Sequence, residues 1–210
     1  MLRSALCALS LFVASHASAT PLFYQLDQNC VGSGCTSGPY GTVELDQTDA
    51  KDVLVTVTLE PGNFFTDNGN HSTLAFSITG DPAILVTGFN NSEFHFNGGP
   101  APDPPFGMNF NYGIGKDNSN DHCCSVLSFS VALASNANLS INDFIATNGF
   151  YFAADIFVGA TGQTGAVAAN QQCGDCGGGT THDLTPEPWS FILTGTGLLG
   201  VLLYRRFAKA

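Results

Sequence analysis

Apolar and polar residues alternate along several short segments in the middle of the chain. Because successive side chains of a β-strand point to opposite faces, a period of two predicts strands with one buried face. The clearest alternating segments are residues 53–59, 74–78, 106–112 and 127–133, and shorter ones are 43–45, 84–87 and 93–96. Residues 150–158 are apolar on both faces, which is typical of a central strand.

One short helix is expected between the last two of these strands. Ser140 stands three residues before Asp143, which resembles a capping box with Asp in place of Glu. The helix is expected to end at residues 148–149, an Asn-Gly pair. Seven or eight strands with one short helix predict an all-β fold, and specifically an antiparallel β-sandwich of the jelly-roll type.

The first 19 residues have the pattern of a secretory signal peptide. Arg3 precedes the apolar run 5–14, and the small residues Ala17 and Ala19 stand at the −3 and −1 positions of a cleavage site after Ala19. The apolar run is too short to span a bilayer, which takes roughly 20 apolar residues. We therefore expect export through the Sec translocon and removal of residues 1–19.

The end of the chain carries three patterns in a fixed order. They are the motif Pro186-Glu187-Pro188, the uncharged apolar segment 189–204, and the basic pair Arg205-Arg206 followed by Lys209. Trp189 and Tyr204 stand at the two edges of the apolar segment, where interfacial aromatic anchors are common. The basic residues directly after it are expected to stay on the cytoplasmic side. The order predicts a transmembrane helix over 189–204 with a basic stop.

This triplet resembles the PEP-CTERM sorting signal of Gram-negative bacteria. The resemblance covers residues 185–210 and rests on Pro186-Glu187-Pro188, the Gly- and Leu-rich apolar segment and the terminal arginines. It implies recognition and processing by an integral-membrane exosortase. It also implies a precursor in the inner membrane and a destination at the cell surface or in the extracellular polysaccharide matrix.

The remaining chain divides into a domain and a linker. Residues 20–164 are expected to form the β-sandwich ectodomain, and the Gly- and Thr-rich residues 165–184 a spacer ahead of the sorting signal. Of the 17 acidic residues only Glu187 lies outside residues 20–184, where Lys51 and Lys116 are the only basic ones, so this span has a net charge of −14. Such a charge excludes nucleic acid as a partner.

Six cysteines remain after removal of the signal peptide, which takes Cys7 with it. An even number in an exported protein favours disulfides, and six cysteines allow 15 pairings. The six are Cys30, Cys35, Cys123, Cys124, Cys173 and Cys176. The first two are expected to close a small loop, and so are the last two. Cys123 and Cys124 either bond each other through a strained ring or pair elsewhere.

No metal or cofactor is expected. Asp117, Ser119 and Asp121 match the first positions of a calcium loop, but His122 stands where an EF-hand has Gly. They are therefore weak calcium candidates, and the default interpretation is an Asn/Asp-rich turn, which makes its own side-chain hydrogen bonds. Cys173 and Cys176 have the spacing of a redox motif, but the glycines after them predict no helix to activate the first thiol.

The sequence contains no catalytic motif. A pair such as Glu93 and Asp155 could act as glycosidase carboxylates, but that role requires a particular separation of the two groups. The function expected is a non-catalytic structural or binding role in the envelope or its extracellular polysaccharide. The alternatives are a secreted carbohydrate-active enzyme or carbohydrate-binding module, and an unprocessed single-pass membrane protein. An acidic cleft lined with aromatic residues would favour the enzyme.

Overall fold

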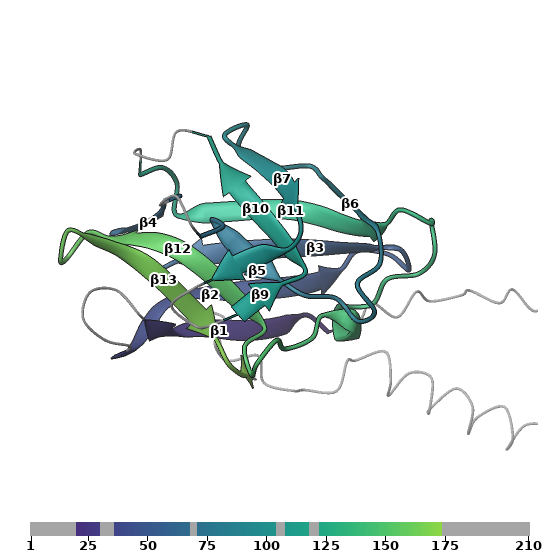
Figure 1. Cartoon of the computed structure of the whole chain (residues 1–210), viewed down its shortest axis with the longest axis horizontal. Helices are drawn as coiled ribbons and strands as arrows, with labels where there is room; N and C mark the ends of the chain where they lie inside the picture. The colour runs from purple at the N-terminus through teal and green to yellow at the C-terminus, as the bar shows by residue number, and fades with distance from the viewer. Residues whose placement is uncertain (1–19, 30–35, 68–70, 104–107, 118–121, 174–210) are drawn as a thin grey trace, which may run out of the picture. The chain divides into compact units, whose positions relative to one another are not determined.

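The regular secondary structure of the described residues is almost wholly β-strand. The computed structural model describes residues 20–29, 36–67, 71–103, 108–117 and 122–173 (Figure 1). Its strands are β1 (Leu22–Asn29), β2 (Thr36–Gln47), β3 (Asp52–Leu59), β4 (Asn63–Phe65), β5 (Leu74–Phe76), β6 (Ile84–Thr87), β7 (Phe94–Gly98), β8 (Ala101–Asp103), β9 (Met108–Phe110), β10 (Tyr112–Lys116), β11 (Val126–Leu133), β12 (Phe152–Val158), β13 (Gln163–Ala169) and β14 (Gln172–Cys173). The prediction of an all-β fold is confirmed.

Most of the strands belong to one antiparallel sheet. Its order is β6-β11-β3-β2-β1-β13-β12-β5-β10-β7, with β14 added beside β1 and β4 beside β12. Strands β8 and β9 form a separate two-stranded hairpin. The first strand of the chain, β1, therefore lies in the interior of the sheet, between β2 and β13.

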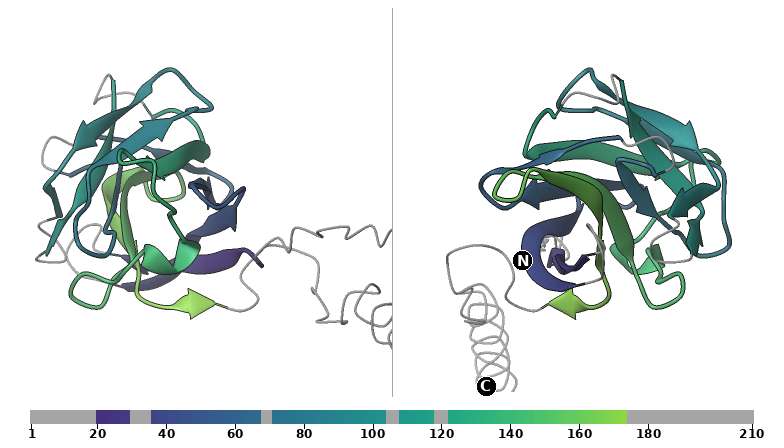
Figure 2. Two further views of the ribbon diagram at one scale, coloured as in Figure 1. Left: turned by 90° about the vertical axis from the view of Figure 1, so that its right-hand side faces the viewer. Right: turned by 60° about the vertical axis from the view of Figure 1, so that its left-hand side comes forward.

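The sheet curls until it is nearly closed. Its two end strands, β6 and β7, are consecutive in the chain and are joined by residues 88–93, which can span at most about 25 Å. Phe76 of β5 and Phe129 of β11 lie far apart in the strand order, yet their ring centroids are 6.1 Å apart. Figure 2 shows the strands wrapping around a common interior. Side chains of both halves of the sheet therefore share one core.

The alternation seen in the sequence marks the buried face of the strands. Val53, Val55 and Val57 of β3 are fully buried, whereas Thr58 between the last of these and Leu59 is exposed. Strand β11 pairs with β3 along its length and presents Leu127, Phe129 and Val131 to the same core. The period of two predicted both strands correctly because one face of each is covered and the other is not.

The prediction that residues 150–158 form a central strand is also correct. Strand β12 lies between β13 and β5, and Phe152 and Ile156 face the main core. On the opposite face Ala153 is buried in a second, smaller cluster with Ala101 and Phe110 of the β8–β9 hairpin. Both faces of β12 are covered, so polar residues have no solvent-facing positions over most of its length.

The predicted spacer is wrong for its first residues. Strand β13 covers residues 163–169, and its segment Ala166–Ala169 is fully buried between β1 and β12. Small apolar residues suit this position because covered faces leave little room for larger side chains. The sheet therefore extends past residue 164 to Cys173 of β14.

The predicted helix is correct in its start and wrong in its length. Ser140 and Asp143 form the expected capping box, but they cap a single 3-10 turn, Ile141–Asp143. The chain then becomes extended, because Ile145 N donates to Ser77 O at 3.0 Å and continues the pairing beside β5. Residues 148–149 do not end a helix. They form a tight hairpin turn between Thr147 and Phe150, whose backbone groups bond each other at 2.8 and 3.1 Å.

Replacing Gly149 with Ala is expected to destabilise the domain by about 1–2 kcal/mol. Asn148 and Gly149 both have positive φ, 49° and 89°, as a two-residue hairpin turn of this kind requires. A Cβ at Gly149 meets no other atom within 4 Å, so the cost is purely one of backbone conformation. Urea unfolding measures it. Asn148→Gly is the control and is expected to change stability little, and equal losses in both variants would contradict this account of the turn.

Burial of Tyr24 makes the stability of the domain depend on alkaline pH. The pKa of Tyr24 is raised from 10.0 to about 12, first by its burial and then by the neighbouring Tyr151, whose ring centroid is 4.8 Å away. The folded state thus favours the neutral phenol. Its contribution is fully present below pH 10 and is lost as the pH rises towards 12. Urea unfolding across this range is expected to show falling stability, with a smaller slope in Tyr24→Phe. An unchanged slope in that variant would contradict the assignment.

The two predicted terminal signals lie outside the described residues. These are the signal peptide with Ala17 and Ala19, and the sorting signal with Pro186, Glu187, Pro188, Trp189, Tyr204, Arg205 and Arg206. Within the described residues, no helix has the length and apolar character needed to cross a membrane. Both terminal assignments stay predictions.

Candidate functional site

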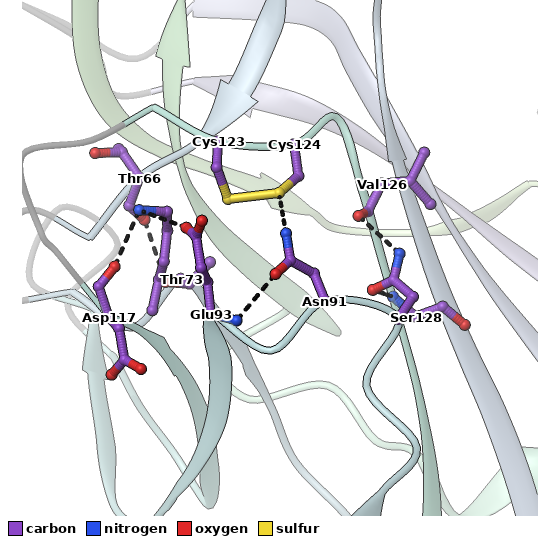
Figure 3. The surroundings of a disulfide bond; sticks show 11 residues. Thr66, Thr73, Asn91, Glu93, Asp117, Cys123, Cys124, Val126 and Ser128 are labelled. Atoms are coloured by element: carbon purple, nitrogen blue, oxygen red, sulfur yellow. Dashed lines mark hydrogen bonds and ion pairs between the residues drawn. A yellow bond between two sulfur atoms is a disulfide. The ribbon is translucent and has the colours of Figure 1, made fainter.

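The most unusual chemical group in the described residues is a disulfide between adjacent cysteines. Cys123 and Cys124 are consecutive in the chain and are bonded, with Cα atoms 3.8 Å apart (Figure 3). Both are partly exposed and pack against the edge of the main core. Cys124 has a φ of 57°, a left-handed conformation that non-glycine residues adopt at a cost. Of the two alternatives for this pair, the structure has the direct bond.

The cysteine segment is held by backbone hydrogen bonds to strands β3 and β4. Phe65 N donates to Cys124 O at 3.1 Å, and Leu59 N donates to Ser125 O at 2.8 Å. Phe65 also forms an isolated bridge with Cys123. These bonds fix the position of the disulfide just before β11 begins.

Asn91 contacts the disulfide from the loop that joins β6 to β7. Its Nδ2 donates to Cys124 Sγ at 2.9 Å, and its Oδ1 accepts from Glu93 N at 3.0 Å. Figure 3 shows the amide directed at the sulfur of Cys124. The Asn91 side chain is therefore held at both ends, and a hydrogen-bond donor faces one sulfur of the pair.

A buried ion pair lies next to this contact. The side chain of Lys116 at the end of β10 is fully buried, and its Nζ lies 3.4 Å from Glu93 Oε2. The same Nζ donates to Asp117 O at 3.1 Å, and Asp117 N donates to Glu93 O at 2.8 Å. Burying an ammonium group costs free energy unless anionic and carbonyl oxygens surround it. The pair therefore fastens the start of β7 to the end of β10.

Side chains and one backbone hydrogen bond, from Asn90 N to Ser128 O at 3.0 Å, hold the β6–β7 loop to the start of β11. Asn90 Nδ2 donates to Val126 O at 3.1 Å, and Ser128 N donates to Asn90 Oδ1 at 3.0 Å. Asn91 adds its bond to Cys124, just before β11, and the Glu93–Lys116 pair links the same loop to the end of β10. We call residues 90–93 with 116 and 123–128 the seam, since they lie where the two ends of the curled sheet are joined.

A second buried polar pair lies on the outer face of β12. Asp155 is fully buried, and its Oδ1 lies 3.9 Å from His71 Nδ1. Thr66 N donates to Asp155 O and Asp155 N donates to Thr73 O, each at 3.1 Å, so the backbone around the carboxylate is paired. A carboxylate inside an apolar strand needs a partner, and His71 is a residue that faces it.

The candidate carboxylates for glycoside hydrolysis each have a basic neighbour of their own. Glu93 pairs with Lys116, and Asp155 faces His71. The Glu93–Lys116 pair fits a structural role, because a carboxylate paired with an ammonium needs no substrate to balance its charge. The expectation of a non-catalytic role stays a prediction.

The weak calcium candidates are only partly within the described residues. The Oδ1 atom of Asp117 lies 3.2 Å from His95 Nδ1, and both side chains are largely exposed. Ser119 and Asp121 lie outside the described residues. In the portions of the chain that the structure describes, no three His, Cys, Asp or Glu side chains gather as a metal site would require. His122 instead stacks on Phe157, with ring centroids 4.0 Å apart.

The other predicted disulfide positions fall at the edge of the described residues or outside them. Cys173 of β14 is disulfide-bonded, whereas Cys30, Cys35 and Cys176 lie outside the described residues. The sequence did not indicate that Asn91 and Lys116 belong to the seam. Only Lys116 had a recognisable signal in the sequence, as a lone lysine in an otherwise apolar and glycine-containing strand.

Comparisons with known proteins assign neither the fold nor the seam to a family. Comparisons with protein-family models, with curated proteins and with solved structures gave no match.

Proposed function

We propose that this chain is an exported bacterial envelope or cell-surface protein, sorted by an exosortase, with a non-catalytic structural or binding role. The observation that carries the proposal is the order of patterns at the end of the sequence: Pro-Glu-Pro at 186–188, an apolar segment at 189–204 and a basic end. The processing enzyme would be an integral-membrane exosortase. The destination would be the cell surface or the extracellular polysaccharide matrix.

The chemistry of the described domain supports an exported location. Cys173 is disulfide-bonded, and structural disulfides persist in oxidising compartments outside the cytosol. The high negative charge favours solubility at an exposed surface. These features agree with the signal peptide expected over residues 1–19.

For the domain itself we propose a flattened, jelly-roll-like sandwich. One layer would contain β6, β11, β3, β2 and β1, and the other β13, β12, β5, β10 and β7. The support for two layers is the packing of Phe76 on Phe129 across the interior, together with Phe76 on Phe152 within one layer at 6.5 Å. Such a scaffold presents loops and flat outer faces, which suits a matrix or binding role.

The test compares the full chain with two deletions in a bacterium that has an exosortase. One deletion removes residues 185–210, and the matched control removes residues 177–184 and leaves the sorting signal in place. We expect the full chain and the control to reach the surface with a shortened C-terminus, as measured by mass spectrometry. The chain without residues 185–210 is expected to be mislocalised.

Two results would overturn the proposal. If the chain lacking residues 185–210 reaches the same compartment in the same form, the segment is not a sorting signal. If surface protein retains Lys209 and Ala210, the signal is not processed and the chain is a permanent single-pass membrane protein. Loss of surface display in an exosortase-deficient strain would support the proposal.

A further inference from the structure

We propose that the Cys123–Cys124 disulfide is a thiol-exchange site, at which an external dithiol attacks Cys123 and Cys124 is the leaving sulfur. The co-substrate class is a small or protein-borne dithiol. This inference does not depend on the sorting proposal, because it rests on the geometry of the seam alone.

Asn91 determines which sulfur leaves. Its Nδ2 donates to Cys124 Sγ at 2.9 Å, so a thiolate formed on Cys124 receives a hydrogen bond as it develops. A hydrogen bond to a charged acceptor is about twice as strong as one between neutral groups. The orientation of Asn91 is set beforehand by the bond from Glu93 N to its Oδ1. Figure 3 shows the amide directed at Cys124 Sγ and not at Cys123 Sγ, so we assign Cys123 Sγ as the attacked sulfur.

The Cys123–Cys124 disulfide contributes little to the free energy of unfolding of the domain. A disulfide stabilises a protein chiefly by closing a loop in the unfolded chain, and this one encloses no residue between its two cysteines. Reduction also frees Cys124 from the ring in which it has a φ of 57°. The bond can therefore open and close while the surrounding sheet stays folded.

The exchange balances as a two-electron reaction. The thiolate of the dithiol bonds to Cys123 Sγ while the bond between Cys123 Sγ and Cys124 Sγ breaks, and the electron pair leaves on Cys124 Sγ. The second thiol of the reagent, after losing its proton, attacks the reagent sulfur of this mixed disulfide and releases Cys123. The dithiol loses two electrons and two protons and becomes a disulfide, and the cysteine pair gains them as two thiols.

Opening of the pair is expected to loosen the seam locally. The 123–125 segment accepts hydrogen bonds from Phe65 N and Leu59 N, and it receives the Asn91 contact. Freed from the ring, this segment can change backbone conformation at Cys124. Hydrogen exchange at the amides of Phe65 and Leu59 is expected to become faster on reduction, while the amides of the β3–β11 ladder between residues 52 and 57 stay protected.

The first experiment locates the attacked sulfur in the wild-type protein. The folded chain is given a short pulse of glutathione and quenched with acid, and the mixed disulfide is mapped by peptide mass spectrometry. We expect the adduct on Cys123. An adduct mainly on Cys124 would overturn the assignment, and so would a pair that reacts only after addition of denaturant.

The second experiment separates Asn91 from its neighbour. Asn91→Ala is expected to slow reduction of the pair by dithiothreitol about tenfold or more, through loss of a hydrogen bond to a charged leaving group. Asn90→Ala is the matched control, because it removes two seam bonds from the same loop and leaves Cys124 Sγ untouched. Equal rates in both variants would overturn the role of Asn91.

Discussion

Replacing Phe76 with Ala is expected to destabilise the domain by about 3–5 kcal/mol, the largest effect that we predict for a substitution in this protein. Phe76 is fully buried, and its ring lies within 5.5–6.5 Å of the rings of four others, centroid to centroid: Tyr112, Phe129, Phe144 and Phe152. These rings come from both halves of the curled sheet. The substitution therefore leaves a cavity at the point where the two halves meet, and the midpoint of urea unfolding measures the loss.

Phe64→Ala is the matched control for this prediction. Phe64 stands opposite Phe157 on neighbouring strands, but 37% of its surface is exposed. Its removal is expected to cost about 1 kcal/mol or less, the range of a cross-strand pair. Similar losses in the two variants would mean that Phe76 does not lie at the centre of the core.

Replacing Lys116 with Met is expected to destabilise the domain by about 3 kcal/mol. Because Met fills similar space to Lys, the loss of stability measures the effect of removing the ammonium charge. It leaves Glu93 Oε2, which is buried, without the ammonium 3.4 Å away. The expected loss is at the lower end of the range for buried pairs, because about a third of the Glu93 side chain is exposed. Urea unfolding at neutral pH is the measurement.

Two further variants test the origin of this loss. Lys51→Met removes an exposed lysine, whose Nζ bonds Asn136 Oδ1 at 3.0 Å, and is expected to change stability by less than about 0.5 kcal/mol. Adding Glu93→Gln to Lys116→Met removes the charge left behind and is expected to recover part of the stability. A double variant that is no more stable than Lys116→Met would show that the ion pair is not the cause.

The sequence predicted the strands whose two faces differ. In β3 and β11 the buried valines and Phe129 alternate with threonines and serines, so the period of two was visible. It failed for β13, because Ala and Gly residues carry no alternation and both faces of that strand are covered. The predicted helix failed for a related reason. The capping box at Ser140 is a local signal, whereas pairing with Ser77, far along the chain, determined the extended conformation of residue 145.

The seam could not be predicted because its residues meet only after the sheet curls. Asn91 and Cys124 are 33 positions apart, and Lys116 bonds back to Glu93, which directly precedes β7. Nothing near Asn91 in the sequence distinguishes it from its neighbour Asn90. The adjacent cysteines were visible, but their partner in hydrogen bonding was not.

The place of β1 in the sheet bears on the timing of folding. Strand β1 is completed by β13, whose residues are made some 140 positions later, as the pairing of Gln28 with Ala168 shows. Until that late strand has left the ribosome, β1 keeps one edge without a neighbour and the interior stays open to water. Nearly the whole domain must therefore be synthesised before it can reach its native state. A nascent chain that has not yet reached its native state can still be threaded through a narrow channel, as the export that we propose requires.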